Sequence, residues 1–275
     1  MLSARATTLA HDEQGFSLVE LMVAVAAGIV VMAALFTILQ VTLLQTSRTM
    51  TKVSATQRAR TALETIENEL HSACIASQET PIQGGASGSQ QSDDNNLVFV
   101  SQYGAALTPV PIEHKITFDS TSGTLKEYTY SVSGTNPSNW VFSSTPTSSA
   151  GKVLLTNVQA SGTTAAFQYF AYEPYTDSNG NTDMMLMDGS SPVPGTAAVP
   201  NPDPLTTPLS VNDASQTAEI ILTFKVGGDV ASTEVGSNLN TNLSDTWATV
   251  TDSIVLRFVT TPNQLGSNAT FGPCA

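Results

Sequence analysis

A long apolar run near the N-terminus constrains the fold more than any other feature of this 275-residue chain. Between Leu21 and Leu39, the only polar side chain is that of Thr37. A helix needs about 20 consecutive apolar residues to cross a bilayer, so this run predicts one membrane-spanning helix. Glu20 stands directly before the run. A carboxylate at the edge of a bilayer is costly unless a cation or a hydrogen-bond donor meets it, so we expect Glu20 to have a functional partner.

The residues before Glu20 suggest what this partner is. Cleavage of the chain between Gly15 and Phe16 would place a new α-amino group four residues before Glu20. In a bundle of identical helices, the amine of one copy could then pair with Glu20 of the next. At an effective dielectric constant near 20, such a pair at about 4 Å attracts by about 4 kcal/mol before desolvation is subtracted. This attraction can set the axial register of two helices, but the apolar surfaces must hold the bundle together.

Gly15, Phe16 and residues 17–22, followed by the apolar run, resemble the class III signal segment of type IV prepilins and pseudopilins. The resemblance implies that a prepilin peptidase cuts after Gly15, that Phe16 is then N-methylated, and that the helix moves from the membrane into a filament core. It also implies the partners: the prepilin peptidase/N-methyltransferase, other pilin or pseudopilin subunits, an inner-membrane assembly platform, and membrane lipid before assembly. An ordinary signal anchor that contains Gly-Phe by chance is the alternative, but it gives Glu20 no role.

The helix is expected to continue beyond the membrane, because no Pro or Gly occurs between Ile29 and Thr80. After Met50, apolar residues recur at spacings of four and three, which is typical of one helical stripe. The stripe comprises Ala59, Leu63, Ile66, Leu70 and Ala73. The opposite side carries Arg60, Glu64, Glu67 and His71. The pattern predicts a helix of roughly 60 residues, apolar all round in its first half and amphipathic in its second.

The rest of the chain predicts a mostly antiparallel β-sheet. Runs rich in β-branched and aromatic residues alternate with turn residues, and residues 120–123 predict a hairpin. Strands are expected at residues 97–100, 115–118, 124–130, 153–155, 166–172, 184–187, 218–226 and 252–259, with a short edge element at 140–142. Residues 190–208, which are rich in proline, are expected to form a loop, and residues 227–245 a flexible insert.

These elements predict an α+β fold of pilin type, in which a long N-terminal α-helix packs on the sheet. We expect a cleaved leader at 1–15, a transmembrane or filament-core helix at 16–45 and an amphipathic helix extension at 46–77. A polar linker at 78–96 and an extracytoplasmic β-sheet domain with a C-terminal tail at 97–275 would complete the chain.

The composition argues against several classes of function. The net charge is −13, with only ten Lys and Arg residues, and so acidic a chain repels nucleic acid. No Gly-x-Ser-x-Gly, His-Glu-x-x-His or P-loop pattern occurs in the sequence. We therefore expect no enzymatic activity, no cofactor and no nucleic-acid partner.

Two cysteines, Cys74 and Cys274, are the only ones in the chain. A lone pair in an exported protein suggests one disulfide, and the alternative is two separate buried thiols. A disulfide would tie the end of the helix to the C-terminus. In the entropy model, closing so long a loop lowers the entropy of the unfolded chain and stabilises the fold by up to about 4–5 kcal/mol.

One segment fits the spacing of a calcium-binding loop. Asp177, Asn179, Asn181, Asp183 and Asp188 fall at positions 1, 3, 5, 7 and 12 of an EF-hand-like loop. However, the sixth position is Thr182, where that loop needs glycine, and the twelfth is Asp instead of a bidentate Glu. A hairpin whose return strand contains Met184 is the favoured interpretation, and calcium binding is the alternative.

The order of helix, hairpin and later strands resembles the larger minor pilins, namely the J-type minor pseudopilins of type II secretion and the W-type minor pilins of type IV pili. The resemblance implies a structural subunit of a type IV pilus or a type II secretion pseudopilus. The alternative function is a pilus-tip adhesin or a DNA-uptake (competence) subunit. Which of these machines the chain serves stays open.

Orientation in the membrane depends on two opposed signals. Arg48, Lys52, Arg58 and Arg60 follow the apolar run, and the positive-inside rule alone would place them in the cytoplasm. Large domains can translocate despite flanking charge, and prepilins, which this segment resembles, keep the leader inside. We therefore expect a single-pass protein of the cytoplasmic membrane with its C-terminal domain outside, and later a place in a cell-surface pilus or a pseudopilus.

Overall fold

The computed structural model describes residues 17–73, 81–85, 90–103, 110–133, 141–176, 182–186, 204–228 and 247–256. The chain divides into two compact units, Met1–Thr49 and Met50–Ala275. Helix α1 (Leu18–His71) has 54 residues and contributes to both units. The other described elements, including all the strands, belong to the second unit.

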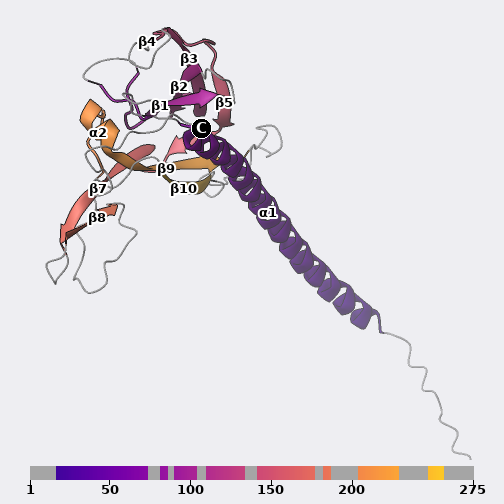
Figure 1. Ribbon diagram of the computed structural model, residues 1–275. Coiled ribbons are helices and arrows are strands. Elements are labelled where there is room, and N and C mark those ends of the chain that lie inside the picture. Colours follow the sequence, from indigo (N-terminus) through magenta and orange to yellow (C-terminus); the bar gives the residue numbers. More distant parts are fainter. Residues whose placement is uncertain are drawn as a thin grey trace, which may run out of the picture. The chain divides into compact units, whose positions relative to one another are not determined.

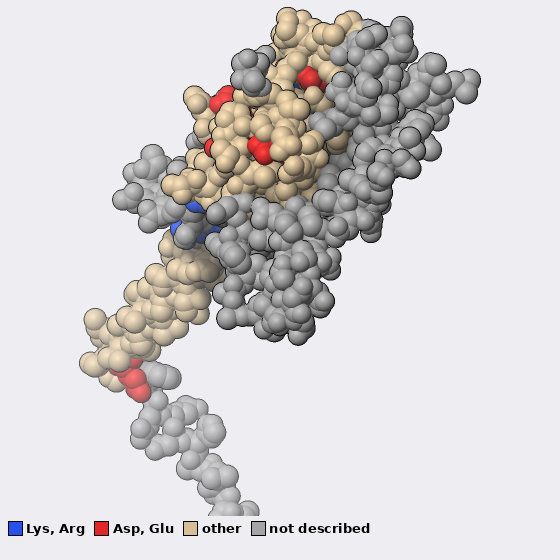
Figure 2. All heavy atoms as spheres, turned by 60° about the vertical axis from the view of Figure 1, so that its left-hand side comes forward, with Lys and Arg blue, Asp and Glu red and all other residues tan. Residues whose placement is uncertain are grey.

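In the first unit, α1 presents apolar side chains to its surroundings. Large apolar residues are exposed from Leu18 to Leu44, and no charged residue occurs between Glu20 and Arg48. Figure 2 shows the corresponding stretch of helix surface without charge. The Thr42 hydroxyl donates to the Ile38 carbonyl oxygen at 2.9 Å, so its polar group is satisfied within the helix. Among the described residues, α1 is the one helix long and apolar enough to cross a membrane, judged by length and composition.

The described residues of the second unit form two antiparallel sheets of five strands each. Figure 1 shows their arrangement. The first sheet has the order β1-β2-β3-β4, and β5 also pairs with β3. Its strands are β1 (Asn96–Tyr103), β2 (Val110–Asp119), β3 (Thr124–Ser133), β4 (Val141–Phe142) and β5 (Lys152–Thr156). One edge of β3 pairs with β2, and β5 and β4 share the other edge.

The second sheet repeats this plan around β9, with the order β10-β9-β7-β8 and β6 also paired with β9. Its strands are β6 (Val158–Ala160), β7 (Phe167–Thr176), β8 (Thr182–Leu186), β9 (Thr217–Gly227) and β10 (Trp247–Val255). A short helix, α2 (Val211–Gln216), precedes β9, and the Ser210 hydroxyl caps it by accepting from the Asp213 backbone N–H.

A single residue, Asn157, joins the two sheets between β5 and β6. Its φ angle is 62°, a conformation that asparagine tolerates better than most residues. The Asn157 Nδ2 donates to the Gly228 carbonyl oxygen at 2.8 Å, and the Asn157 carbonyl oxygen accepts from the Gly227 backbone N–H at 2.8 Å. These bonds hold the crossing point against the end of β9.

One hydrophobic core connects the C-terminal part of α1 with both sheets. The helix contributes Ala55, Ala59, Ala62, Leu63, Ile66 and Leu70, and Ala73 follows two residues after its end. The first sheet contributes Leu97, Phe99, Ile116, Phe118, Leu125 and Leu155, and the second contributes Val158, Phe167, Tyr169, Ile220, Leu222, Phe224, Val226 and Ile254. The predicted stripe on the helix is therefore confirmed, and so is the α+β fold with a long helix on antiparallel strands.

The predicted hairpin at residues 120–123 is also confirmed, because β2 and β3 pair on either side of it. The Asp119 carboxylate accepts from the backbone N–H groups of Thr121 and Ser122 at 2.8 and 3.1 Å. Gly123 has a φ angle of 64°, which a residue without a side chain adopts at little cost. Turn chemistry of this kind is local, and this is why the sequence predicts it well.

Several features differ from the sequence-based expectation. The helix expected to reach residue 77 ends at His71, and the strands form two sheets instead of one. Strand β10 begins at Trp247 instead of residue 252, and neither β6 nor α2 was predicted. In addition, the described parts of the segment expected to be a polar linker contact β1. Ile82 is buried, and the Gln83 backbone N–H donates to the Val98 carbonyl oxygen at 2.9 Å. This short stretch supplies partners for the backbone groups along the edge of β1.

Candidate functional site

Glu20 lies in the first turn of α1 and is exposed. Helical hydrogen bonding has begun by this point, because the Leu21 backbone N–H donates to the Ser17 carbonyl oxygen at 3.1 Å. A carboxylate in a first turn is favoured by the partial positive charge of the helix N-terminus. Gly15 and Phe16, at the predicted cleavage site, lie outside the described residues.

The other predicted sites fall mostly outside the described residues. Cys74 and Cys274 both do, so the disulfide stays a prediction. In the calcium alternative, Asp177, Asn179, Asn181 and Asp188 lie outside them, and of Asp183 only the backbone in β8 is described. Strands β7 and β8 pair on either side of this segment, with Thr176 opposite Thr182. The hairpin interpretation is therefore confirmed, while calcium binding stays untested.

A buried polar cluster lies on the core face of the first sheet, where it meets α1. We use this name for Glu69 of α1, Ser101 of β1, His114 of β2, Glu127 of β3 and Lys152 of β5. The strand pairing places Phe99 opposite His114 and Ile116 opposite Glu127, so the polar side chains alternate with core residues on one face. Ser101, His114 and Glu127 are all at most 4% exposed.

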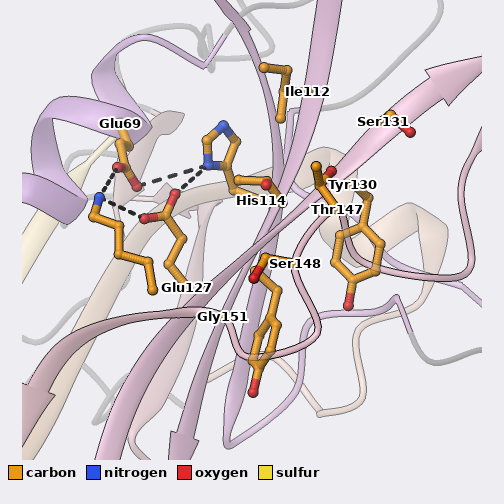
Figure 3. Close-up of a pocket in the computed structure, with 12 residues that line it drawn as sticks. Glu69, Ile112, His114, Glu127, Tyr130, Ser131, Thr147, Ser148 and Gly151 are labelled. Carbon is orange, nitrogen blue, oxygen red and sulfur yellow. Dashed lines mark hydrogen bonds and ion pairs between the residues drawn. The ribbon is translucent and has the colours of Figure 1, made fainter.

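Short contacts connect every member of the buried polar cluster. Figure 3 shows those that join His114 to Glu69 and Glu127. The His114 Nδ1 lies 2.8 Å from the Glu127 Oε1 and 4.0 Å from the Glu69 Oε2. The His114 Nε2 lies 2.8 Å from the Ser101 Oγ. The Lys152 Nζ lies 2.9 Å from the Glu127 Oε2 and 3.6 Å from the Glu69 Oε1.

The two carboxyl groups differ in how well their charge is compensated. Burial opposes ionisation of Glu127, but its hydrogen bonds with His114 and Lys152 lower its pKa to about 2. For Glu69, burial raises the pKa, and the nearby Glu127 carboxylate raises it further. The hydrogen bond to Glu127 in turn raises the pKa of Lys152. Glu127 is thus the carboxyl group whose negative charge is stabilised by its neighbours, whereas the negative charge of Glu69 is disfavoured.

The Ser101–His114–Glu127 arrangement has the hydrogen-bond order of a hydrolytic triad. A pocket of about 470 Å³ adjoins the cluster, lined by residues that include Glu69, His114, Glu127 and Lys152. Ser101 does not line this pocket and has no exposed surface. A serine nucleophile must reach its substrate, so the geometry does not support hydrolysis at Ser101.

The buried polar cluster offers donor atoms for a metal ion. One ligand atom each from Glu69, His114 and Glu127 lies within 4.8 Å of the other two. Imidazole nitrogen and carboxylate oxygen are donor types that zinc and related metals use. Sequence reasoning missed this site, because its members lie far apart in the chain and no spacing motif joins them. The available signal was Glu127, a charge at a core-facing position of a strand.

Glu113 is a further buried acid, on the opposite face of β2 from His114. Within the described residues, its Oε1 has no hydrogen-bond partner. Burial raises its pKa from 4.5 to about 8, against a smaller lowering effect of Lys115. Below pH 4.5 the group is neutral in both the folded and the unfolded chain. As the pH rises towards 8, the unfolded chain ionises first, and the fold loses stability.

The variant Glu113→Gln is therefore expected to be more stable than the wild type near pH 8 and similar to it near pH 4.5. Glutamine carries no charge, so it removes a penalty of up to about 1.4 kcal/mol per pH unit across this window. Urea unfolding of the detergent-solubilised chain at both pH values measures the difference. If the free energy of unfolding changes equally with pH in the wild type and the variant, Glu113 does not have the raised pKa.

One comparison with known proteins gives a match. The family model described as the prokaryotic N-terminal methylation motif matches residues 11–36. The matched segment contains the predicted cleavage site, Glu20 and the first part of the apolar run. No curated protein and no solved structure matches the chain.

Proposed function

From the methylation motif at residues 11–36, which is the class III signal segment of type IV prepilins and pseudopilins, we propose that this pilin-type subunit is a minor pilin or minor pseudopilin. The motif implies processing by a prepilin peptidase and assembly with other pilins, and it favours a structural subunit over an enzyme. The observation that carries the proposal is the continuity of one helix. The motif leads directly into an exposed apolar stretch of α1 in which Glu20 is the last charge before Arg48.

In this proposal, cleavage after Gly15 frees the amine of Phe16, and the apolar stretch exchanges lipid for the helices of neighbouring subunits. That stretch is already exposed along its whole length, as a surface that must be covered by lipid or by other helices requires. Glu20 of one subunit pairs with the amine of another and sets the step between them. The leader starts in the cytoplasm, and the second unit lies on the outer side of the membrane.

The size of the second unit supports a minor position. It comprises residues 50–275, and its described residues form ten strands in two sheets. Such a unit is bulky for the repeating subunit of a thin fibre. A subunit that begins or ends a filament has fewer neighbours to accommodate. The filament is a type IV pilus or a type II secretion pseudopilus, and the chain would share its assembly platform with the other subunits of that machine.

The variant Glu20→Ala tests the filament role. Cleavage should be intact, because the junction at Gly15 and Phe16 is unchanged. Incorporation into sheared filaments, measured as the ratio of filament-bound to membrane-bound chain, should fall about tenfold, the effect of a net loss near 1.4 kcal/mol. The matched control is Glu64→Ala, which removes an exposed acid from the second unit's part of the same helix. Unchanged incorporation of Glu20→Ala would count against the pairing.

A further inference from the structure

We propose that Glu69, His114 and Glu127 bind a divalent transition-metal ion of the zinc type. This site is separate from the N-terminal segment and does not depend on the filament function. It joins α1 to strands β2 and β3 of the first sheet, because each ligand comes from a different element. A bound ion would therefore fasten the helix to the sheet through three coordinate bonds.

The spacing of the donor atoms fits such an ion. Zinc binds imidazole nitrogen and carboxylate oxygen at about 2.0–2.2 Å, so neighbouring donors of a tetrahedral site lie roughly 3.3 Å apart. The His114 Nδ1 lies 2.8 Å from the Glu127 Oε1 and 4.0 Å from the Glu69 Oε2. These two distances bracket the required value, and small side-chain rotations of the two glutamates would equalise them.

The orientation of His114 is already fixed by contacts on its far side. Its Nε2 lies 2.8 Å from the Ser101 Oγ, and its ring stacks on Phe99 with centroids 5.1 Å apart and an interplanar angle of 9°. A metal-binding histidine commonly donates its second ring N–H to a neighbouring oxygen, and this leaves the first nitrogen bare for the ion. Ser101 offers that oxygen, so the Nδ1 could bind the ion in place of its present hydrogen bond with Glu127.

Charge in the buried polar cluster also favours a divalent ion. Within the cluster, two carboxyl groups share a single ammonium, that of Lys152. Glu69 is the less well compensated of the two. It is 9% exposed, and its Oε2 accepts no hydrogen bond from any described residue. A buried carboxylate oxygen that accepts no hydrogen bond is costly. A divalent ion at this point would neutralise both carboxylates.

The ion can displace the Lys152 ammonium from Glu69 and Glu127. The Lys152 side chain is 61% exposed and extends from β5 on a flexible stem, so it can turn outwards without disturbing the core. The pocket of about 470 Å³ beside the cluster is lined by all three ligands and provides an entrance. It also leaves room for water as a further ligand. Lys152 and the metal ion are thus alternative cations for one pair of carboxylates.

The test uses the untagged full-length chain in detergent with Co²⁺ as the probe, because tetrahedral Co²⁺ has a visible absorption band. We expect one Co²⁺ per chain, displaced by Zn²⁺ but not by Ca²⁺. Glu69→Gln keeps the shape of the side chain and should weaken Co²⁺ binding at least tenfold. The control Glu64→Gln changes an exposed acid of the same helix and should leave binding unchanged.

Lys152→Ala provides the decisive second variant, because it removes the competing ammonium and should tighten Co²⁺ binding several-fold. A purely structural ion-pair network predicts no Co²⁺ binding at all. The proposal is overturned if the wild type binds no Co²⁺ stoichiometrically, or if Glu69→Gln binds it as tightly as the wild type. If circular dichroism shows that Glu69→Gln is unfolded, unchanged or weaker binding by Lys152→Ala overturns the proposal instead.

Discussion

Replacing Gly15 with valine is expected to abolish removal of the leader. A peptidase must approach the backbone closely at the bond it cuts, and glycine permits this because it has no side chain. Valine places a branched side chain directly before Phe16. Intact-mass spectrometry of the chain from cells that contain a prepilin peptidase should show a wild type that begins at Phe16 and a Gly15→Val variant that retains residues 1–15.

The control for this experiment is Ala10→Val, which also introduces a valine inside the leader but away from the junction. It should be cleaved like the wild type. Two results would contradict the prediction: a Gly15→Val chain processed as fully as the wild type, or a wild-type chain from which the apolar helix itself has been removed. The second result would point to an ordinary signal peptide and would remove the basis of the proposed function.

The variant Ile66→Ala is expected to lower the free energy of unfolding of the second unit by about 2–5 kcal/mol. Ile66 has no exposed surface and belongs to the core that α1 shares with both sheets. Truncation removes apolar contacts and leaves a cavity that neighbouring strands cannot fully close. Urea unfolding of the detergent-solubilised chain, followed by circular dichroism, measures the loss.

Leu35→Ala is the matched control for Ile66→Ala, because it shortens an aliphatic side chain of the same helix that is exposed in the first unit. Its effect on urea unfolding should be small. A loss below about 1 kcal/mol for Ile66→Ala, comparable to that of the control, would show that the helix is not an integral part of the core.

The features that could be predicted from sequence are those set by local periodicity or turn chemistry. The stripe from Ala59 to Ala73 repeats every three to four residues, and its members are buried as expected. The hairpin after Asp119 depends on four consecutive residues. The methylation motif is likewise one short segment, and the family model finds it at the same place.

The buried polar cluster and the division into two sheets could not be predicted in this way. Both depend on which strands pair and in which register, and these contacts join residues far apart in the chain. Glu69 illustrates the difficulty. It stands beside Leu70 at the border of the apolar stripe, and only the placement of β2, β3 and β5 shows that its carboxyl group is buried among ionisable partners.

In the proposed role as a filament subunit, the chain would be pushed or pulled, and Asn157 has a mechanical consequence for that role. A one-residue connection, held at its side chain and its carbonyl oxygen, is too short and too constrained to act as a hinge. Load applied through one sheet must therefore pass directly into the other. Such a body transmits force as a rigid block and does not absorb it by flexing between its two halves.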